Sequence, residues 1–226
     1  MRKYLLICIY IFIAISSISC SNSAGKEVDL GLSVNWAECN LGASSPEEYG
    51  DYYAWGELTP KEVYSRETYL WHDPKNREIT LYEDNISGWN GLDPAADKWA
   101  NGWRMPTASE INELIEKCTF SSNTYNGVKG LVVTGPNGNS IFLPTGGHMM
   151  DSYCHRFGGI LEFPFEYDSG YYWSGTLNNY WASRGKINSD SPIALSISHS
   201  DCNAENVWTH SILHYYGCLI RPVKSK

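Results

Sequence analysis

Apolar residues recur along the chain with two different periods, and these separate helical segments from extended ones. From position 111 the apolar side chains follow at i, i+3, i+4 and i+7, namely Ile111, Leu114, Ile115 and Cys118. This spacing predicts an amphipathic helix. Thr107, with Glu110 three positions later, forms a capping box where that helix begins. We expect the apolar face of the helix to be buried against a sheet.

A second, shorter helix is predicted just upstream. Asp93 is a suitable N-cap, and Pro94 fits the first helical position because that position needs no backbone N–H. From there the helix is expected to run through residues 95–99 and to stop at Gly102.

Strands are predicted where the period falls to two. Apolar and polar residues alternate over residues 30–35 and again over 193–198, as is typical of a half-buried strand. Residues 213–223 supply an expected closing strand. Residues 58–92 are polar and show no sustained period, so we expect a long irregular excursion. Such a region either is functional or contains a helix or strand that the pattern does not reveal.

Two turn signals predict a group of hairpins. Asn126-Gly127 lies between two runs of strand-forming residues, and 136–138 (PNG) separates 131–134 from 140–143. Three antiparallel strands fit these spacings. Mixed loops, then two helices, then hairpins, without βαβ alternation, predict an α+β fold around a twisted antiparallel sheet.

The N-terminus has the order of an export signal. Arg2 and Lys3 precede an apolar run over 4–15, and small residues lead to Cys20. The run is shorter than the roughly 20 residues that a membrane-spanning helix needs, so we expect 1–19 to be cleaved and Cys20 to be lipidated. The alternative is a plain secretory signal in which this cysteine is incidental.

This N-terminus predicts the partners and the location of the mature chain. Residues 20–27 are expected to form a lipidated tether, and 28–226 a single domain. The lipid would attach the protein to a membrane, as an outer-membrane lipoprotein on the cell surface or the periplasmic face. Loss of the two signal-peptide cations changes the formal charge from −8 to −10. Nucleic acid and anionic surfaces are therefore not expected as partners.

Five cysteines follow the lipidation site. They are Cys39, Cys118, Cys154, Cys202 and Cys218. Because the count is odd, at least one thiol stays free or pairs outside the chain. Cys202 with Cys218 is the first disulfide to consider, and scattered buried thiols are an equal alternative. No spacing matches a zinc motif, so no metal is expected from these residues.

Residues 103–107 (WRMPT), followed by a helix, resemble a motif of the Fibrobacter major paralogous domain family and of related bacterial lipoproteins. The other matching blocks are 28–37 (VDLGLSVNWA), 49–57 (YGDYYAWGE), 135–144 (GPNGNSIFLP), and 172–176 (YWSGT) with 221–223 (RPV). Together they span nearly the whole mature chain. The resemblance implies a C-type-lectin-like fold, similar also to formylglycine-generating enzymes, in which terminal strands pair and long loops form a binding face. It implies no known reaction.

These blocks first predict structural roles. Trp36, Trp55, Trp103 and Trp173 lie in segments of strand or turn character, so we interpret them as core residues. Arg104 precedes a helix, and we expect it to be paired with loop carbonyls, because a buried cation cannot be left without partners.

Candidate ligand residues lie where the sequence loses its core character, within 177–192 and 199–216. They are Tyr180, Trp181, Asn188, Asp190, Asp201, Asn203, Asn206, Trp208 and His210. Rings that stack on sugars, beside amides and carboxylates that bind hydroxyls, suit a carbohydrate or protein surface. An ordinary solvated loop has the same composition, so this alternative stays open.

Catalytic and metal motifs are not found in the sequence. It has no GxSxG, phosphate-loop or HExxH motif. Compared with calcium-dependent lectins, 135–137 (GPN) and 89–91 (WNG) lack the acidic ligand residue. We therefore expect no enzyme activity and no cofactor. The predicted function is a lipid-anchored recognition or adhesion module for a glycan or a cell-surface protein. The alternative is a structural or assembly subunit of a surface appendage.

Overall fold

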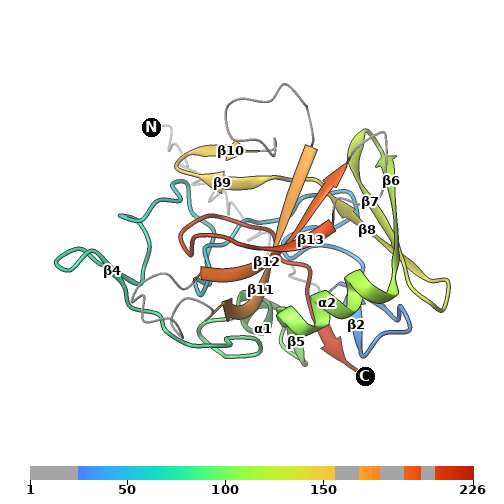
Figure 1. Ribbon diagram of the computed structural model, residues 1–226, viewed down its shortest axis with the longest axis horizontal. Coiled ribbons are helices and arrows are strands. Elements are labelled where there is room, and N and C mark those ends of the chain that lie inside the picture. The colour runs from blue at the N-terminus through green and yellow to red at the C-terminus, as the bar shows by residue number, and fades with distance from the viewer. Residues whose placement is uncertain (1–24, 156–167, 179–190, 200–206) are drawn as a thin grey trace, which may run out of the picture.

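Strands from the two ends of the chain pair with each other in this computed structural model (Figure 1), which describes residues 25–155, 168–178, 191–199 and 207–226. Strand β2 (Val34–Ala37) lies antiparallel to β14 (Val223–Ser225), with Trp36 opposite Val223. With β1 (Glu27–Val28) and β5 (Trp103–Arg104) they form a sheet in the order β1-β2-β14-β5. Glu27, placed in the predicted tether, is thus part of this sheet.

Two more three-stranded sheets and two hairpins complete the described strands. These are β3 (His72–Asp73), β4 (Glu78–Ile79), β6 (Thr119–Tyr125), β7 (Val128–Thr134), β8 (Ser140–Pro144), β9 (His148–Met150), β10 (Tyr153–His155), β11 (Asp168–Asn178), β12 (Ser191–His199) and β13 (Val207–Ser211). The sheets have the orders β6-β7-β8 and β11-β12-β13, and every strand pair in them is antiparallel. With only two helices among the described residues, the α+β class is confirmed.

Both predicted helix starts are confirmed. In α2 (Ala108–Lys117) the Thr107 hydroxyl accepts from the Glu110 amide, and the Glu110 carboxylate accepts from the Thr107 amide. In α1 (Pro94–Trp99) the Asp93 carboxylate accepts from two amides of the first turn. This helix ends at Trp99, before the expected stop at Gly102, because the backbone already turns to positive φ at Ala100.

The hairpin predictions are confirmed, but two other strand predictions need correction. Residues 30–33 are buried alternately as expected, yet they form a bend, because Gly31 adopts a φ of 78° that ends the extended backbone. The closing strand is shorter and later than 213–223. Residues 217–219 form only isolated bridges, and the paired segment is Val223–Ser225.

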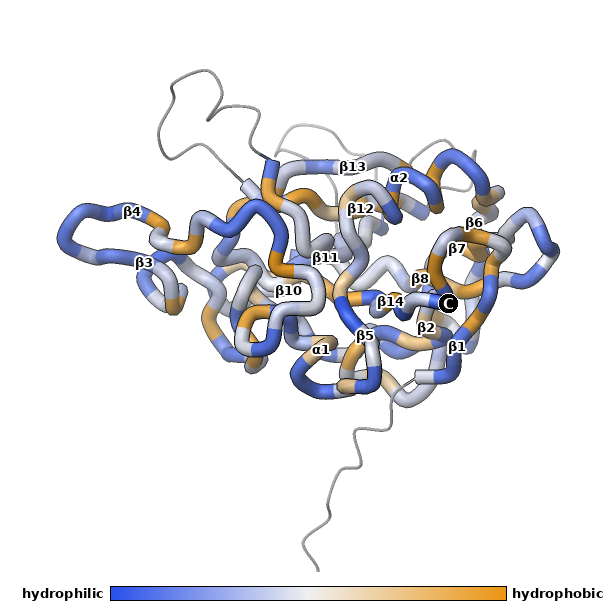
Figure 2. The backbone as a smooth tube through the Cα atoms, turned by 90° about the horizontal axis from the view of Figure 1, so that it is seen from below, coloured by the Kyte–Doolittle hydropathy of each residue, from blue (hydrophilic) through white to orange (hydrophobic). Residues whose placement is uncertain are grey.

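Residues 58–92 form the expected irregular excursion, in which the short β3–β4 hairpin is the main regular element. The excursion lies on the opposite side of the molecule from the β6-β7-β8 sheet (Figure 1). Its hairpin is hydrophilic along most of its length (Figure 2). No helix in the described parts of the chain combines the length and the apolar character that crossing a membrane requires.

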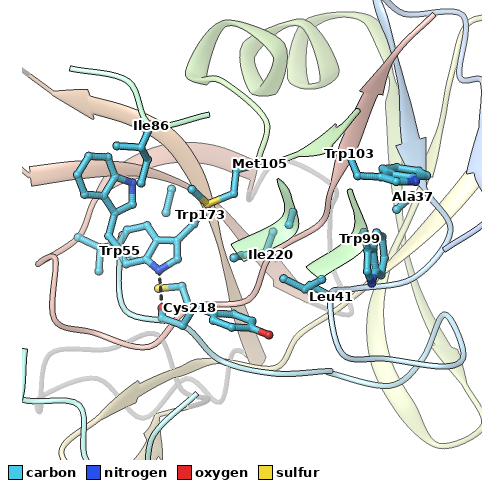
Figure 3. Packing of buried hydrophobic residues seen from close by; sticks show 14 of the residues in the cluster. Ala37, Leu41, Trp55, Ile86, Trp99, Trp103, Met105, Trp173, Cys218 and Ile220 are labelled. Atoms are coloured by element: carbon cyan, nitrogen blue, oxygen red, sulfur yellow. Dashed lines mark hydrogen bonds between the residues drawn. The ribbon is translucent and has the colours of Figure 1, made fainter. Parts of the chain in front are cut away.

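Tryptophans occupy the centres of the two main core clusters. Trp36, Trp55, Trp103 and Trp173 are at most 3% exposed, so their prediction as core residues is confirmed. Figure 3 shows Trp55, Trp173 and Cys218 in the same buried cluster, and Trp99 beside Trp103. Buried indoles need hydrogen-bond acceptors. Trp173 Nε1 donates to the Tyr53 carbonyl at 2.7 Å, and Trp55 Nε1 to the Ser174 carbonyl at 2.9 Å.

Cys218 is a free thiol buried in the core, and Cys202, the first partner considered for it, lies outside the described residues. Arg104 also differs from its prediction. It donates to the Met105 carbonyl as expected, but its main partner is the Glu110 carboxylate, which it contacts with both terminal nitrogens. The capping box thereby also neutralises the cation.

Candidate ligand-binding groove

Two adjoining pockets form a groove between the 58–92 excursion, the end of β9 and the turn that follows β13. The first, called here the apolar pocket, is lined by Arg66, Ile79, Leu81, Tyr82, Leu177, Ser191, Leu213, His214 and Tyr215. The second, the polar pocket, is lined by Tyr64, Ser65, Arg66, Glu67, Arg77, Met150, Asp151, Tyr215 and Tyr216. Because both share Arg66 and Tyr215, we refer to them together as the Arg66–Tyr215 groove.

The pockets differ in size as well as chemistry. The polar pocket has a volume of about 330 Å³, within the range of small-molecule sites. The apolar pocket has a volume of about 60 Å³ and accommodates only a small part of a ligand. Tyr82 (59% exposed) and Leu213 (39% exposed) leave much of their apolar surface open to solvent at the apolar pocket. Such rings and side chains provide contact area for a ligand that extends across both pockets.

The segment that carries Arg66 is fixed on both sides. The Tyr64 hydroxyl donates to the Tyr52 carbonyl, and the Tyr69 hydroxyl donates to the Trp55 carbonyl, each at 2.6 Å. The backbone of Tyr64 also exchanges two hydrogen bonds with Asp151. Burial raises the pKa of the Tyr64 hydroxyl to about 12, so it remains a donor at neutral pH. The segment around Arg66 is therefore held in place although it lies outside the helices and strands.

Aromatic rings support the other wall of the groove. The Tyr216 ring meets the Tyr215 ring edge to face, with centroids 5.4 Å apart. On its other side it stacks on His148, which in turn stacks on His155. Burial and, to a smaller extent, the neighbouring His155 lower the pKa of His148 to about 4, so His148 is neutral at pH 7. A neutral ring packs in this column without the cost of a buried charge.

Arg66 lies over the ring of Tyr215, with its guanidinium carbon 5.9 Å from the centroid. Within the described part of the chain, neither Arg66 nor Arg77 forms an ion pair with a carboxylate. The pKa of Glu67 is lowered mainly by hydrogen bonds from the Glu67 amide and from Ser65. Arg66 lowers this pKa only slightly. Among the described residues, the groove therefore holds two guanidinium groups that form no ion pair.

Most of the predicted ligand residues lie outside the described residues. They are Tyr180, Trp181, Asn188, Asp190, Asp201, Asn203 and Asn206, and the predicted lipidation site Cys20 lies outside as well. Leu177 and Ser191, which line the apolar pocket, are close to the two boundaries of the undescribed segment 179–190.

Trp208 and His210 are described, and both are exposed on β13. They lie opposite Ser196 and Ala194 of β12, and neither lines the groove. The first residue after His210 that lines the groove is Leu213. The groove residues of this region therefore lie in the C-terminal part of the predicted 199–216 range.

Sequence reasoning missed the half of the groove that comes from residues 64–82. The available signal was the irregular excursion itself, since long loops in compact domains often carry function. Nothing in its sequence indicates that Arg66 meets Tyr215. Asn137, considered above for calcium, has a structural role, because its amide donates to the Asp29 carbonyl at 2.8 Å. The described residues contain no group of three or more His, Cys, Asp and Glu side chains placed to hold a metal ion.

Comparisons of the chain with protein-family models, with curated proteins and with solved structures gave no match.

Proposed function

We propose that this protein is a lipid-anchored, non-enzymatic recognition module of C-type-lectin-like fold, and that it binds a glycan in the Arg66–Tyr215 groove. The observation that carries the proposal is the groove itself. It combines an exposed aromatic surface, cations that form no ion pair with any described carboxylate, and a fixed backbone. Convergent polar groups beside an apolar surface are typical of ligand sites.

Two features of the topology support the finer fold assignment. Strands from the two ends of the chain pair, and a long irregular region provides one wall of the groove. Both were implied by the resemblance of residues 103–107 and the other matching blocks to the paralogous domain family. The N-terminal sequence supports export and lipidation at Cys20, with the outer membrane as the proposed location.

Rigid positioning favours recognition over an incidental surface hollow. Tyr64 and Tyr69 anchor the excursion on both sides of Arg66, and stacked rings support Tyr215. A site that is already ordered loses less conformational entropy when it binds a ligand.

A glycan array tests the proposal. The full chain, expressed with its own leader and purified in detergent, is applied with calcium and, in parallel, with a chelator. We expect saturable binding to a limited set of glycans, with no dependence on calcium, because the acidic ligand residues of calcium-dependent lectins are missing. If a protein with a cooperative unfolding transition binds no glycan, the proposal fails.

A second candidate function, assembly into a surface structure, is favoured by one observation. Strand β6 lies at the edge of its sheet, has no charged residue, and exposes every side chain except Phe120, which is partly buried. Exposed edges without charges are suited to pairing with a strand of another chain. This function would be favoured if the protein binds no glycan and associates with itself at high concentration, and if Thr124→Lys abolishes that association.

A further inference from the structure

We infer that the groove selects saccharides that carry a carboxylate and that the guanidinium of Arg66 receives this group. The inference rests on the proposed function, because it names the class of glycan bound at the same site. Two observations carry it: Arg66 and Arg77 form no ion pair within the part of the chain that the structure describes, and the two halves of the groove differ chemically.

The division of the groove sets the shape of the ligand. In the apolar pocket Ile79, Leu81 and Leu213 line the wall, and Tyr82 presents an exposed ring. The polar pocket is lined instead by Arg77 and other charged residues. A ligand that occupies both pockets needs an apolar face at one end and charged or hydroxyl groups at the other. A pyranose ring with a carboxylate substituent has this distribution.

Arg66 is positioned where the two halves meet. Arg66 contacts the face of the Tyr215 ring. This contact, unlike an ion pair, leaves the N–H groups of Arg66 available as hydrogen-bond donors. Those donors have the fork geometry that binds a carboxylate through two parallel hydrogen bonds. The formal charge of the whole chain is −8, so the presence of two arginines in one groove does not reflect a generally basic surface.

The two carboxylates of the polar pocket are compatible with an anionic ligand. Glu67 is exposed, so water screens its charge. Asp151 is fixed by its backbone pairing with Tyr64, and as an acceptor it suits the hydroxyl groups of a sugar. Arg77 lines the same pocket and offsets part of its negative charge. The lining thus provides a cationic position for a carboxylate and an anionic position for hydroxyls.

The test compares acidic glycans with their neutral forms on the full chain. The probes are a galacturonate oligomer and a sialylated lactose, each as free acid and as methyl ester, with titration at low and at physiological salt. We expect at least one free acid to bind about tenfold more tightly than its ester, and high salt to reduce this preference. The two arms distinguish uronic from sialic acids, and a preference in either supports the inference.

The variants are Arg66→Gln, Arg66→Lys and, as a matched control, Lys75→Gln. Lys75 is an exposed cation of the same excursion that does not line the groove. Arg66→Gln should abolish the preference for acid over ester, Arg66→Lys should keep part of it, and Lys75→Gln should keep all of it. Melting temperatures equal to that of the wild type verify folding, which we expect because Arg66 makes no structural ion pair within the described residues.

Three results would overturn the inference. Equal affinity for acids and esters would leave the glycan function standing and remove the carboxylate preference. A preference that Arg66→Gln does not change would place the carboxylate elsewhere. Binding of a hexaglutamate peptide, with no binding of any glycan, would overturn both this inference and the proposed function.

Discussion

The guanidinium of Arg221 donates to the carbonyl of Phe142 at 2.8 Å and thereby joins the C-terminal segment to β8. The same side chain donates to the Asn40 amide oxygen and to the carbonyls of Ala37 and Glu38. Arg221 is only 1% exposed, and burial lowers the pKa of its guanidinium. One buried cation therefore connects the N-terminal loop, the β6-β7-β8 sheet and the C-terminus.

Replacing Arg221 by methionine should strongly destabilise the fold. The substitution fills similar volume but leaves buried carbonyls without donors, so we expect a loss of about 3–5 kcal/mol in the free energy of unfolding. Urea denaturation measures it. Arg77→Met, at an exposed position, is the control and should change stability by less than about 0.5 kcal/mol. Equal denaturation midpoints for both variants would contradict this role of Arg221.

Acid should destabilise the protein through His214. This ring is 5% exposed, and burial lowers its pKa from 6.5 to about 4. Between these values the unfolded chain binds a proton that the folded chain excludes, so the stability is complete above pH 6.5 and declines as the pH falls towards 4. With about 1.4 kcal/mol per pKa unit, the decline is on the order of 2–3 kcal/mol for this group.

Denaturation curves between pH 4 and pH 7 measure this effect. His148 acts in the same direction, because its pKa is also lowered to about 4. His214→Gln should therefore remove part of the pH dependence, and the variant that also carries His148→Gln should remove more. An unchanged slope in the double variant would show that the acid sensitivity comes from other groups.

Gly135 should not tolerate a methyl group. A Cβ at this position would lie 2.0 Å from the Leu30 carbonyl oxygen, and relief of that contact requires a backbone shift. We expect Gly135→Ala to cost about 1–3 kcal/mol. Gly138→Ala is the comparison, since nothing lies within 4 Å of its Cβ and only its φ of 86° opposes the change, at a cost of about 1 kcal/mol. Thermal melts of the two variants in parallel test this order; the reverse order would contradict it.

Local signals were sufficient for the helices and the first hairpins. The caps at Asp93 and Thr107 and the turn at Asn126-Gly127 depend on residues within a few positions of each other, and all three are confirmed. The alternation over 30–35 correctly predicted which side chains are buried. It did not reveal the positive φ of Gly31, which makes this segment a bend.

Long-range contacts explain what the sequence did not reveal. Arg221 has backbone carbonyls from distant segments as its partners, and carbonyls leave no trace in side-chain patterns. The groove likewise depends on the approach of the 58–92 excursion to the turn after β13, which brings Arg66 over Tyr215. The sequence indicated only that neither region has the apolar periodicity of a buried helix or strand.

The most direct test of the glycan-binding groove is the affinity of the best array glycan for two tyrosine variants, measured by titration calorimetry. Tyr215→Ala removes the ring that both pockets share, and Tyr153→Ala removes a 72% exposed ring on β10 that lines neither pocket. If the groove binds the glycan, Tyr215→Ala weakens binding at least tenfold and Tyr153→Ala leaves it unchanged. Unchanged binding by a folded Tyr215→Ala protein would show that the glycan does not bind in the groove.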